Sequence, residues 1–203
     1  MKKTARDRLV DSGLRSRGQQ NEFFGDLSRE EVLTAARRNG DVLMTAGKAF
    51  NDDVEVVLAA VQSSVDALLW AAPALKEDKR VLLAACAANG RALRYTQKLR
   101  SDRDVALVAV AQDGDALQFC AAPLRADRAV VAAACRQTGW ALQYASEALR
   151  DDEAVVAVAT AQDPKAARCA SARLRNSPAM NKALPAAGVR SDAKGGGSGG
   201  KLW

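Results

Sequence analysis

Residues 126–150 read ADRAVVAAACRQTGWALQYASEALR, and this stretch is one copy of a 25-residue unit that repeats along the chain. The two neighbouring copies, residues 101–125 and 151–175, share its early acidic residue, its apolar run and its final Leu-Arg. The upstream copies are residues 52–76 at full length, residues 77–100 with one deletion, and residues 27–51 in a weaker form. Self-similarity at a fixed period predicts a repeat architecture.

Each unit has the signals that begin a helix. An Asp precedes each apolar run, and a carboxylate there can accept the unpaired first-turn amides at the positive end of a helix. The predicted N-cap residues are Asp53, Asp78, Asp102, Asp127 and Asp152. A turn signal then follows in every unit: Asn39-Gly40, Ser64-Val65, Asn89-Gly90, Asp113-Gly114, Thr138-Gly139 and Asp163-Pro164. Glycine can adopt the left-handed conformation that ends a helix, and proline cannot continue one.

The second half of each unit also has helical periodicity. Ala141, Leu142, Ala145 and Leu149 recur at spacings of three and four residues, which gives one buried stripe. A pair of helices this short cannot bury the stripe alone, so neighbouring repeats must stack. The sequence therefore predicts an all-α protein, an α-solenoid of about six 25-residue helix-turn-helix repeats.

The repeats divide the chain into four predicted regions. Residues 1–26 form a basic N-terminal arm or cap, and residues 27–175 form the solenoid. Residues 176–190 begin a seventh unit without a second half, which is typical of a terminal cap, and residues 191–203 form a glycine-rich flexible tail.

The repeats resemble a known family, the domain of unknown function 4116, over roughly residues 27–175. The closest copy runs from Asp127 through Gly139 to Arg150. The family's units have the form Asp-x-x-Val-Val-x-x-Ala-Val, a glycine turn, then Ala-Leu-x-Tyr-Ala-Ser-x-x-Leu-Arg. The chain departs from this form at Val65, Ala167 and Cys169. The resemblance implies short helical tandem repeats and contributes no catalytic residue. Since such repeats are common in algae and other protists, it also suggests an organellar or photosynthetic complex.

Charge and composition limit the classes of function. The net charge is +6, but residues 27–175 contain 20 basic and 19 acidic side chains, so the excess lies in the terminal regions. A nearly neutral body lacks the single-signed face that phosphate binding needs, which makes a nucleic-acid partner unlikely. No apolar run is long enough to span a membrane. The four cysteines, Cys86, Cys120, Cys135 and Cys169, share positions with Val and Ala, which favours reduced thiols in a soluble protein of the cytosol or an organelle matrix or stroma.

Two sets of residues could bind a partner, because each recurs once per unit. An aromatic column is formed by Trp70, Tyr95, Phe119 and Tyr144, and a basic ladder ends the units at Lys76, Arg100, Arg125, Arg150 and Arg175. The aromatic column could be a stacking groove, although core packing between repeats is the simpler interpretation. The basic ladder could bind an acidic partner, although pairing with the next acidic cap or with helix C-termini would also explain it.

Two further candidates are single features. Trp140 occupies a position filled elsewhere by Asp41, Asp66, Arg91, Asp115 and Lys165, so we expect it to face water. There it could contact a partner or be an isolated surface aromatic without a role. The tail ends in Lys201, Leu202 and Trp203, and we expect Trp203 to insert into a partner's pocket with Leu202 beside it and Lys201 at the rim, unless the tail is an adventitious linker.

No catalytic constellation is evident. The chain has no histidine, its acidic residues fall mainly at caps, and it lacks a phosphate-binding glycine loop and a GxSxG motif. We therefore expect a protein without cofactor or metal that is not an enzyme. The favoured function is a protein–protein interaction scaffold, such as an accessory or linker subunit of a larger complex. The alternatives are an RNA-binding helical repeat protein and an effector-type interaction module.

Overall fold

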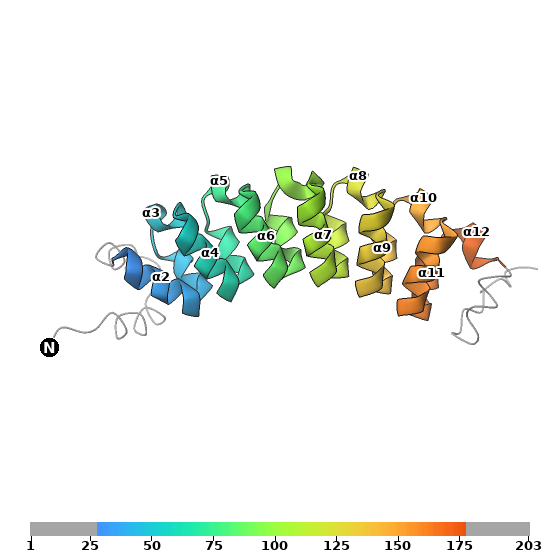
Figure 1. Cartoon of the computed structure of the whole chain (residues 1–203), viewed down its shortest axis with the longest axis horizontal. Helices are drawn as coiled ribbons and strands as arrows, with labels where there is room; N and C mark the ends of the chain where they lie inside the picture. Colours follow the sequence, from blue (N-terminus) through green and yellow to red (C-terminus); the bar gives the residue numbers. More distant parts are fainter. Residues whose placement is uncertain (1–27, 178–203) are drawn as a thin grey trace, which may run out of the picture.

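The structure is a computed structural model that describes residues 28–177, and within that range every regular element is helical. The repeats lie side by side in one elongated row, with each stacked on the next (Figure 1). This confirms the predicted all-α repeat fold. Over the same range, no helix has the length and apolarity needed to cross a membrane.

Each repeat contains three elements. It begins with a ten-residue α-helix: α2 (Arg29–Arg38), α4 (Val54–Ser63), α6 (Lys79–Ala88), α7 (Arg103–Gln112), α9 (Arg128–Gln137) and α11 (Glu153–Gln162). A 3-10 helix follows: η1 (Gly40–Met44), η2 (Val65–Leu69), η3 (Gly90–Tyr95), η5 (Gly114–Phe119), η6 (Gly139–Tyr144) and η7 (Pro164–Cys169). A short helix ends the repeat: α3 (Lys48–Asn51), α5 (Pro73–Lys76), η4 (Lys98–Ser101), α8 (Ala122–Arg125), α10 (Glu147–Arg150) and α12 (Ala172–Arg175).

The predicted acidic N-caps are confirmed. In the fifth repeat, Oδ1 of Asp127 accepts hydrogen bonds from the backbone N–H groups of Ala129 at 2.8 Å and Val130 at 3.2 Å. Asp53, Asp102 and Asp152 cap α4, α7 and α11 in the same way, and Asp78 caps α6 through one bond, from the N–H of Arg80. Helix α2 instead begins with a capping box between Ser28 and Glu31. These bonds pair the first amides of each helix, which have no partner within the helix.

The second half of the repeat differs from the single second helix that the periodicity predicts. After the 3-10 helix η6, Ala145 is extended (φ −67°, ψ 158°), and the chain then starts α10. The N–H of Ser146 donates to the carbonyl oxygen of Arg125 in the preceding repeat at 2.8 Å. Equivalent bonds join Ala72 to Asn51, Ala121 to Arg100 and Ser171 to Arg150. The second half of the repeat is thus interrupted after the 3-10 helix, and the N–H that follows the break donates to the preceding repeat.

The turn glycines have a different role from the predicted one. None of them has a positive φ, and among residues 28–177 only Gly47 does. Instead, a Cβ on Gly90 would lie 2.2 Å from the carbonyl oxygen of Ala109, and a Cβ on Gly139 would lie 2.5 Å from that of Ala159. Glycine is therefore required because the 3-10 helix closely approaches the ten-residue helix of the next repeat.

A glutamine from the next repeat completes this contact. The N–H of Gly90 donates to Oε1 of Gln112 at 2.6 Å, and Gly114 and Gly139 donate likewise to Gln137 and Gln162. The second repeat has Val65 at the glycine position, and its 3-10 helix η2 makes no comparable contact with α6. Where Val65 replaces glycine, the 3-10 helix thus packs less closely against the next repeat, and the junction between the second and third repeats is looser.

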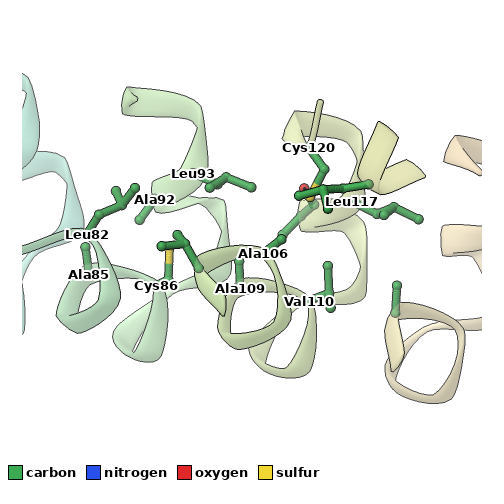
Figure 2. Close-up of a cluster of buried hydrophobic side chains, with 14 of the residues drawn as sticks. Leu82, Ala85, Cys86, Ala92, Leu93, Ala106, Ala109, Val110, Leu117 and Cys120 are labelled. Atoms are coloured by element: carbon green, nitrogen blue, oxygen red, sulfur yellow. The ribbon is translucent and has the colours of Figure 1, made fainter. Parts of the chain in front are cut away.

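Small residues fill the core between repeats. Val, Leu, Ala and Cys side chains from consecutive ten-residue helices and 3-10 helices form one continuous buried cluster. Figure 2 shows Leu82 of α6 beside Ala92 of η3, and Cys86 and Leu93 on the side of Ala106 and Ala109 of α7 in the next repeat. Alanines such as Ala106 and Ala109 are fully buried there, which lets the helices approach closely.

The one-residue deletion in residues 77–100 is compensated by a carboxylate. Glu77 accepts hydrogen bonds from Oγ1 of Thr96 at 2.5 Å, the N–H of Gln97 at 2.9 Å and the N–H of Lys98 at 3.1 Å. Burial raises the pKa of Glu77, but these bonds and the Lys98 charge outweigh it and lower the pKa below its usual value. The side chain therefore takes the place of the missing backbone bond between repeats.

Candidate interaction surface

The charged side chains of the repeats form two sets that differ in their pairing. The first set, which we call the cap seam, joins the first residue of four of the ten-residue helices to the capping Asp of the next repeat. Its pairs are Arg29–Asp53 at 2.6 Å, Lys79–Asp102 at 2.9 Å, Arg103–Asp127 at 2.9 Å and Arg128–Asp152 at 3.1 Å. The seam is interrupted only where Val54 replaces the cation, and there Asp78 pairs with Arg80 of its own helix. These cations are neutralised within the chain.

The cap seam was not predicted from the sequence. Its signal was present, because a Lys or Arg directly follows the capping Asp in three of the units and the capping Ser28 in the first. The carboxylate that it contacts lies 23 or 24 residues away, as in Lys79–Asp102 and Arg103–Asp127. Local pairing rules for helices consider partners three or four residues apart, so they do not find it.

The second set is the predicted basic ladder, here called the cation row: Lys76, Arg100, Arg125, Arg150 and Arg175. Within residues 28–177 none of these five side chains forms an ion pair. The predicted pairing of Arg100 with Asp102 is therefore not formed. Two of the cations instead donate to the carbonyl ends of their own 3-10 helices: Lys76 Nζ to Leu69 O at 2.8 Å, and Arg100 Nη2 to Arg94 O at 2.9 Å.

Three arginines of the cation row have the same environment. The Nε atoms of Arg100, Arg125 and Arg150 are buried and have no hydrogen-bond acceptor. The residues as a whole are half-buried, so each side chain lies against the protein while part of it remains accessible. Arginine often binds in this manner, with its stem packed and its terminal nitrogens available to a carboxylate.

The aromatic residues alternate with these cations along the array. Tyr95, Phe119 and Tyr144 are half-buried and pack against the core, as the simpler interpretation of the column predicts. The carbonyl oxygen of Arg100 accepts a hydrogen bond from the N–H of Ala121, which lies two residues after Phe119 in the next repeat. The Arg100 side chain donates to the carbonyl oxygen of Arg94, which precedes Tyr95 in the same repeat. Arg100 thus contacts the chain next to the aromatic residue of its own repeat and near that of the next repeat.

Carboxylates also lie close to the two tyrosines of the aromatic column. The hydroxyl of Tyr95 donates to Oδ1 of Asp66 at 2.5 Å, and burial together with this bond raises the pKa of Tyr95 to about 12. Burial and the nearby Asp115 charge raise the pKa of Tyr144. The guanidinium of Arg94 also lies 4.8 Å from the centroid of the Tyr95 ring. The aromatic column is therefore flanked by carboxylates as well as by cations.

One end of this surface is apolar. The large hydrophobic side chains that are exposed among the described residues are Met44 (45%), Leu69 (50%) and Trp70 (40%), which we call the apolar patch. Met44 and Leu69 occupy equivalent positions in η1 and η2, and these two helices are in contact. Later repeats have polar residues at this position: Arg94, Gln118, Gln143 and Arg168. The apolar patch is thus confined to the first two repeats.

The other predicted binding residues have different positions. Trp140 is half-buried, and its Nε1–H donates to Oδ2 of Asp163 in the next repeat at 2.8 Å. Lys201, Leu202 and Trp203 lie outside the residues that the structure describes, as do the N-terminal arm and the glycine-rich tail.

The cysteines pack in the core. Cys86, Cys120 and Cys135 are buried and Cys169 is half-buried, and none forms a disulfide. Burial raises the pKa of Cys86 to about 12 and those of Cys120 and Cys135 to about 11. These thiols stay protonated at neutral pH, which agrees with their interpretation as small core residues.

Comparison with known proteins identifies one family. Residues 78–125, which span the third and fourth repeats, match the model of the domain of unknown function DUF4116. The matched segment lies within the region whose sequence resembles that family. No curated protein and no solved structure matches the chain.

Proposed function

We propose that this chain is a non-catalytic scaffold that binds another protein along the surface formed by the apolar patch, the aromatic column and the cation row. In the cell it would act as an accessory or linker subunit of a larger complex. The observation that carries the proposal is the contrast between the two sets of cations. Those of the cap seam are paired with carboxylates, whereas the cation row recurs in five of the six repeats without ion pairs in residues 28–177.

A stacked array suits this role because its surface grows with each repeat. Side chains that recur at one position per repeat form rows that an extended partner can follow. The repeats are tied together by glycine–glutamine contacts, backbone hydrogen bonds and the cap seam, so the rows lie on a preorganised surface. Preorganisation lowers the entropic cost of binding.

An RNA partner is the second candidate, because cations alternating with aromatic rings are also typical of surfaces that bind single strands. Two features rank it below a protein partner. Asp66 and Asp115 lie beside the rings and would repel phosphates. The charges of residues 27–175 also nearly balance. A protein segment can match a surface of mixed charge, whereas a nucleic acid presents a uniformly negative backbone.

Site-specific photocrosslinking tests the proposal. A photoreactive phenylalanine analogue is placed at Gln118, exposed on η5 within the surface, and at Gln62, exposed on α4 outside it. Irradiation in cells should give discrete protein adducts from position 118 that persist after nuclease treatment. Position 62 is the matched control and should give few. Equal adducts from both positions, or adducts from position 118 that nuclease removes, would contradict a protein-binding role for this surface.

A further inference from the structure

We infer that the partner's bound region is an acidic segment with an apolar anchor at one end, the anchor lying on the apolar patch and the carboxylates on the cation row. This inference rests on the proposed function and specifies its partner. It follows from the order of side chains along the array: apolar in the first two repeats, then cationic.

Charge complementarity gives the first argument. Lys76, Arg100, Arg125 and Arg150 end consecutive repeats, and among residues 28–177 no carboxylate forms an ion pair with any of them. Their attachment to the protein is through carbonyl oxygens or packing, as Lys76 to Leu69 and Arg100 to Arg94 show. A row of half-buried cations favours carboxylates strongly, because desolvation strengthens such hydrogen bonds.

The apolar patch gives the second argument, because it lies where the cation row begins. Lys76 donates to the carbonyl oxygen of Leu69, so the first cation of the row adjoins the patch directly. The neighbouring junction is also the one where Val65 replaces glycine and η2 lacks close contact with α6. Trp70 is 40% exposed there, whereas Tyr95, Phe119 and Tyr144 are half-buried in the later, tighter repeats. An aromatic with a large exposed face is the kind of residue that anchors partners.

The repeat spacing limits the partner's sequence. Packed helices lie roughly 8–10 Å apart, and an extended chain rises about 3.3 Å per residue, so one repeat corresponds to about three residues of an extended partner. The expected partner segment therefore has one or two large apolar residues at one end, followed by Asp or Glu at about every third position. This pattern distinguishes it from a uniformly acidic tail.

The test uses the full chain and labelled synthetic peptides in a fluorescence anisotropy titration. The probe has leucine and phenylalanine at one end and glutamate at every third position thereafter, and a second probe reverses the order. We expect one of them to bind and the affinity to fall as salt is raised. The same peptide with glutamine in place of glutamate should bind about tenfold more weakly or worse. An oligouridylate probe should bind less well than the acidic peptide.

Matched variants separate the cation row from general charge. Arg125→Gln with Arg150→Gln should weaken peptide binding about fivefold or more, whereas Arg103→Gln with Arg128→Gln removes the same charge from the cap seam and should weaken it less than about twofold. Arg125→Lys with Arg150→Lys keeps the charge and should restore most of the affinity, which excludes misfolding as the cause. Trp70→Ala should weaken binding while leaving the helical circular dichroism intact.

Several results would overturn the inference. The inference is wrong if the glutamine peptide binds as tightly as the glutamate peptide, or if the cap-seam variants lose as much affinity as the cation-row variants. It is also wrong if neither acidic probe binds, or if the oligouridylate binds more tightly than the acidic peptide. If the photocrosslinking from position 118 succeeds while the peptides fail, the scaffold role stands and only the acidic-segment inference is wrong. If the peptides bind but position 118 gives no protein adducts, the scaffold role is wrong.

Discussion

The indole Nε1–H of Trp140 donates to Oδ2 of Asp163 in the next repeat at 2.8 Å, and Arg91 contacts Asp113 from the equivalent position at the same distance. Asp163 and Asp113 each begin a 3-10 helix, where Oδ1 accepts a backbone N–H. A tryptophan in one repeat and an arginine in another thus have the same role, since each donates to a capping carboxylate of the next repeat. The polar end of Trp140 is therefore used within the chain, and only its ring is left for a partner.

Trp140→Phe keeps an aromatic side chain, although a smaller one, and removes the Nε1–H donor, so we expect the free energy of unfolding to fall by about 1–2 kcal/mol. A double-mutant cycle in urea with Asp163→Asn measures the pair itself, with an expected coupling of about 1 kcal/mol. Strict additivity of the two substitutions would show that the hydrogen bond contributes nothing to stability.

Gly139→Ala should lower the free energy of unfolding by about 2–3 kcal/mol, because its Cβ would lie 2.5 Å from the backbone oxygen of Ala159. Val65→Ala is the matched control, since that position already accommodates a side chain, and it should cost about 1 kcal/mol. Thermal and urea unfolding followed by circular dichroism would measure both. An unchanged midpoint for Gly139→Ala would refute the close-approach explanation of the turn glycines.

Gln137→Ala removes the acceptor of the buried N–H of Gly114 and should destabilise the protein by about 1–3 kcal/mol. Gln62→Ala serves as control, because that side chain is exposed on α4, and its effect should stay within about 0.5 kcal/mol. Hydrogen exchange at the Gly114 amide gives a local measurement. It should accelerate in the Gln137 variant, and unchanged protection would mean that another group accepts this hydrogen bond.

Stability should be nearly constant between about pH 5.5 and 7.5 and should fall on acidification, because the chain has no histidine and its capping carboxyls are the groups that titrate. Hydrogen bonds from Arg29, Lys79 and Arg103 lower the pKa values of Asp53, Asp102 and Asp127 below the usual 3.8. The unfolded chain therefore binds more protons near these pKa values. Stability is full above about pH 5 and is lost as the pH falls through and below 3.8.

Urea midpoints measured across this range would test the prediction, and Arg103→Gln provides a specific control. Without Arg103 the pKa of Asp127 should rise toward its ordinary value, so the variant should lose less stability between neutral and acid pH than the parent chain. Because Arg103 is exposed and solvent screens the pair, the difference should be small. A protein that becomes more stable on acidification would contradict this account.

Several features of the fold could be predicted because they depend on interactions that are local in sequence. The capping of α9 by Asp127 involves residues two and three positions away, and the apolar run from Val130 to Cys135 supplies the buried face of one helix. Repetition of these signals at 25-residue spacing identifies the all-α array. The aromatic column was likewise found from its spacing. The packing of Tyr95, Phe119 and Tyr144 against the core agrees with the simpler interpretation, whereas Trp70 is exposed.

Other features depended on contacts between repeats. Periodicity alone does not reveal that Ala145 breaks the second helix, because the competing hydrogen bond comes from Arg125 of the preceding repeat. The same limitation led to the wrong explanation of Gly139, whose φ is ordinary and whose missing side chain makes room for Ala159.

By itself, the sequence determined the class of fold, the register of the repeats and the starts of their helices, since each follows from hydrogen bonds and apolar spacing within a few residues. Only the tertiary structure decided which cations are neutralised. Arg103 and Arg125 belong to the same repeat, yet Arg103 meets Asp127 while Arg125 meets no carboxylate among residues 28–177. In sequence, Arg103 is flanked by Asp102 and Asp104, and Arg125 lies two residues before Asp127. Neither arginine forms an ion pair with these sequence neighbours, so their surroundings are set by the offset with which one repeat stacks on the next.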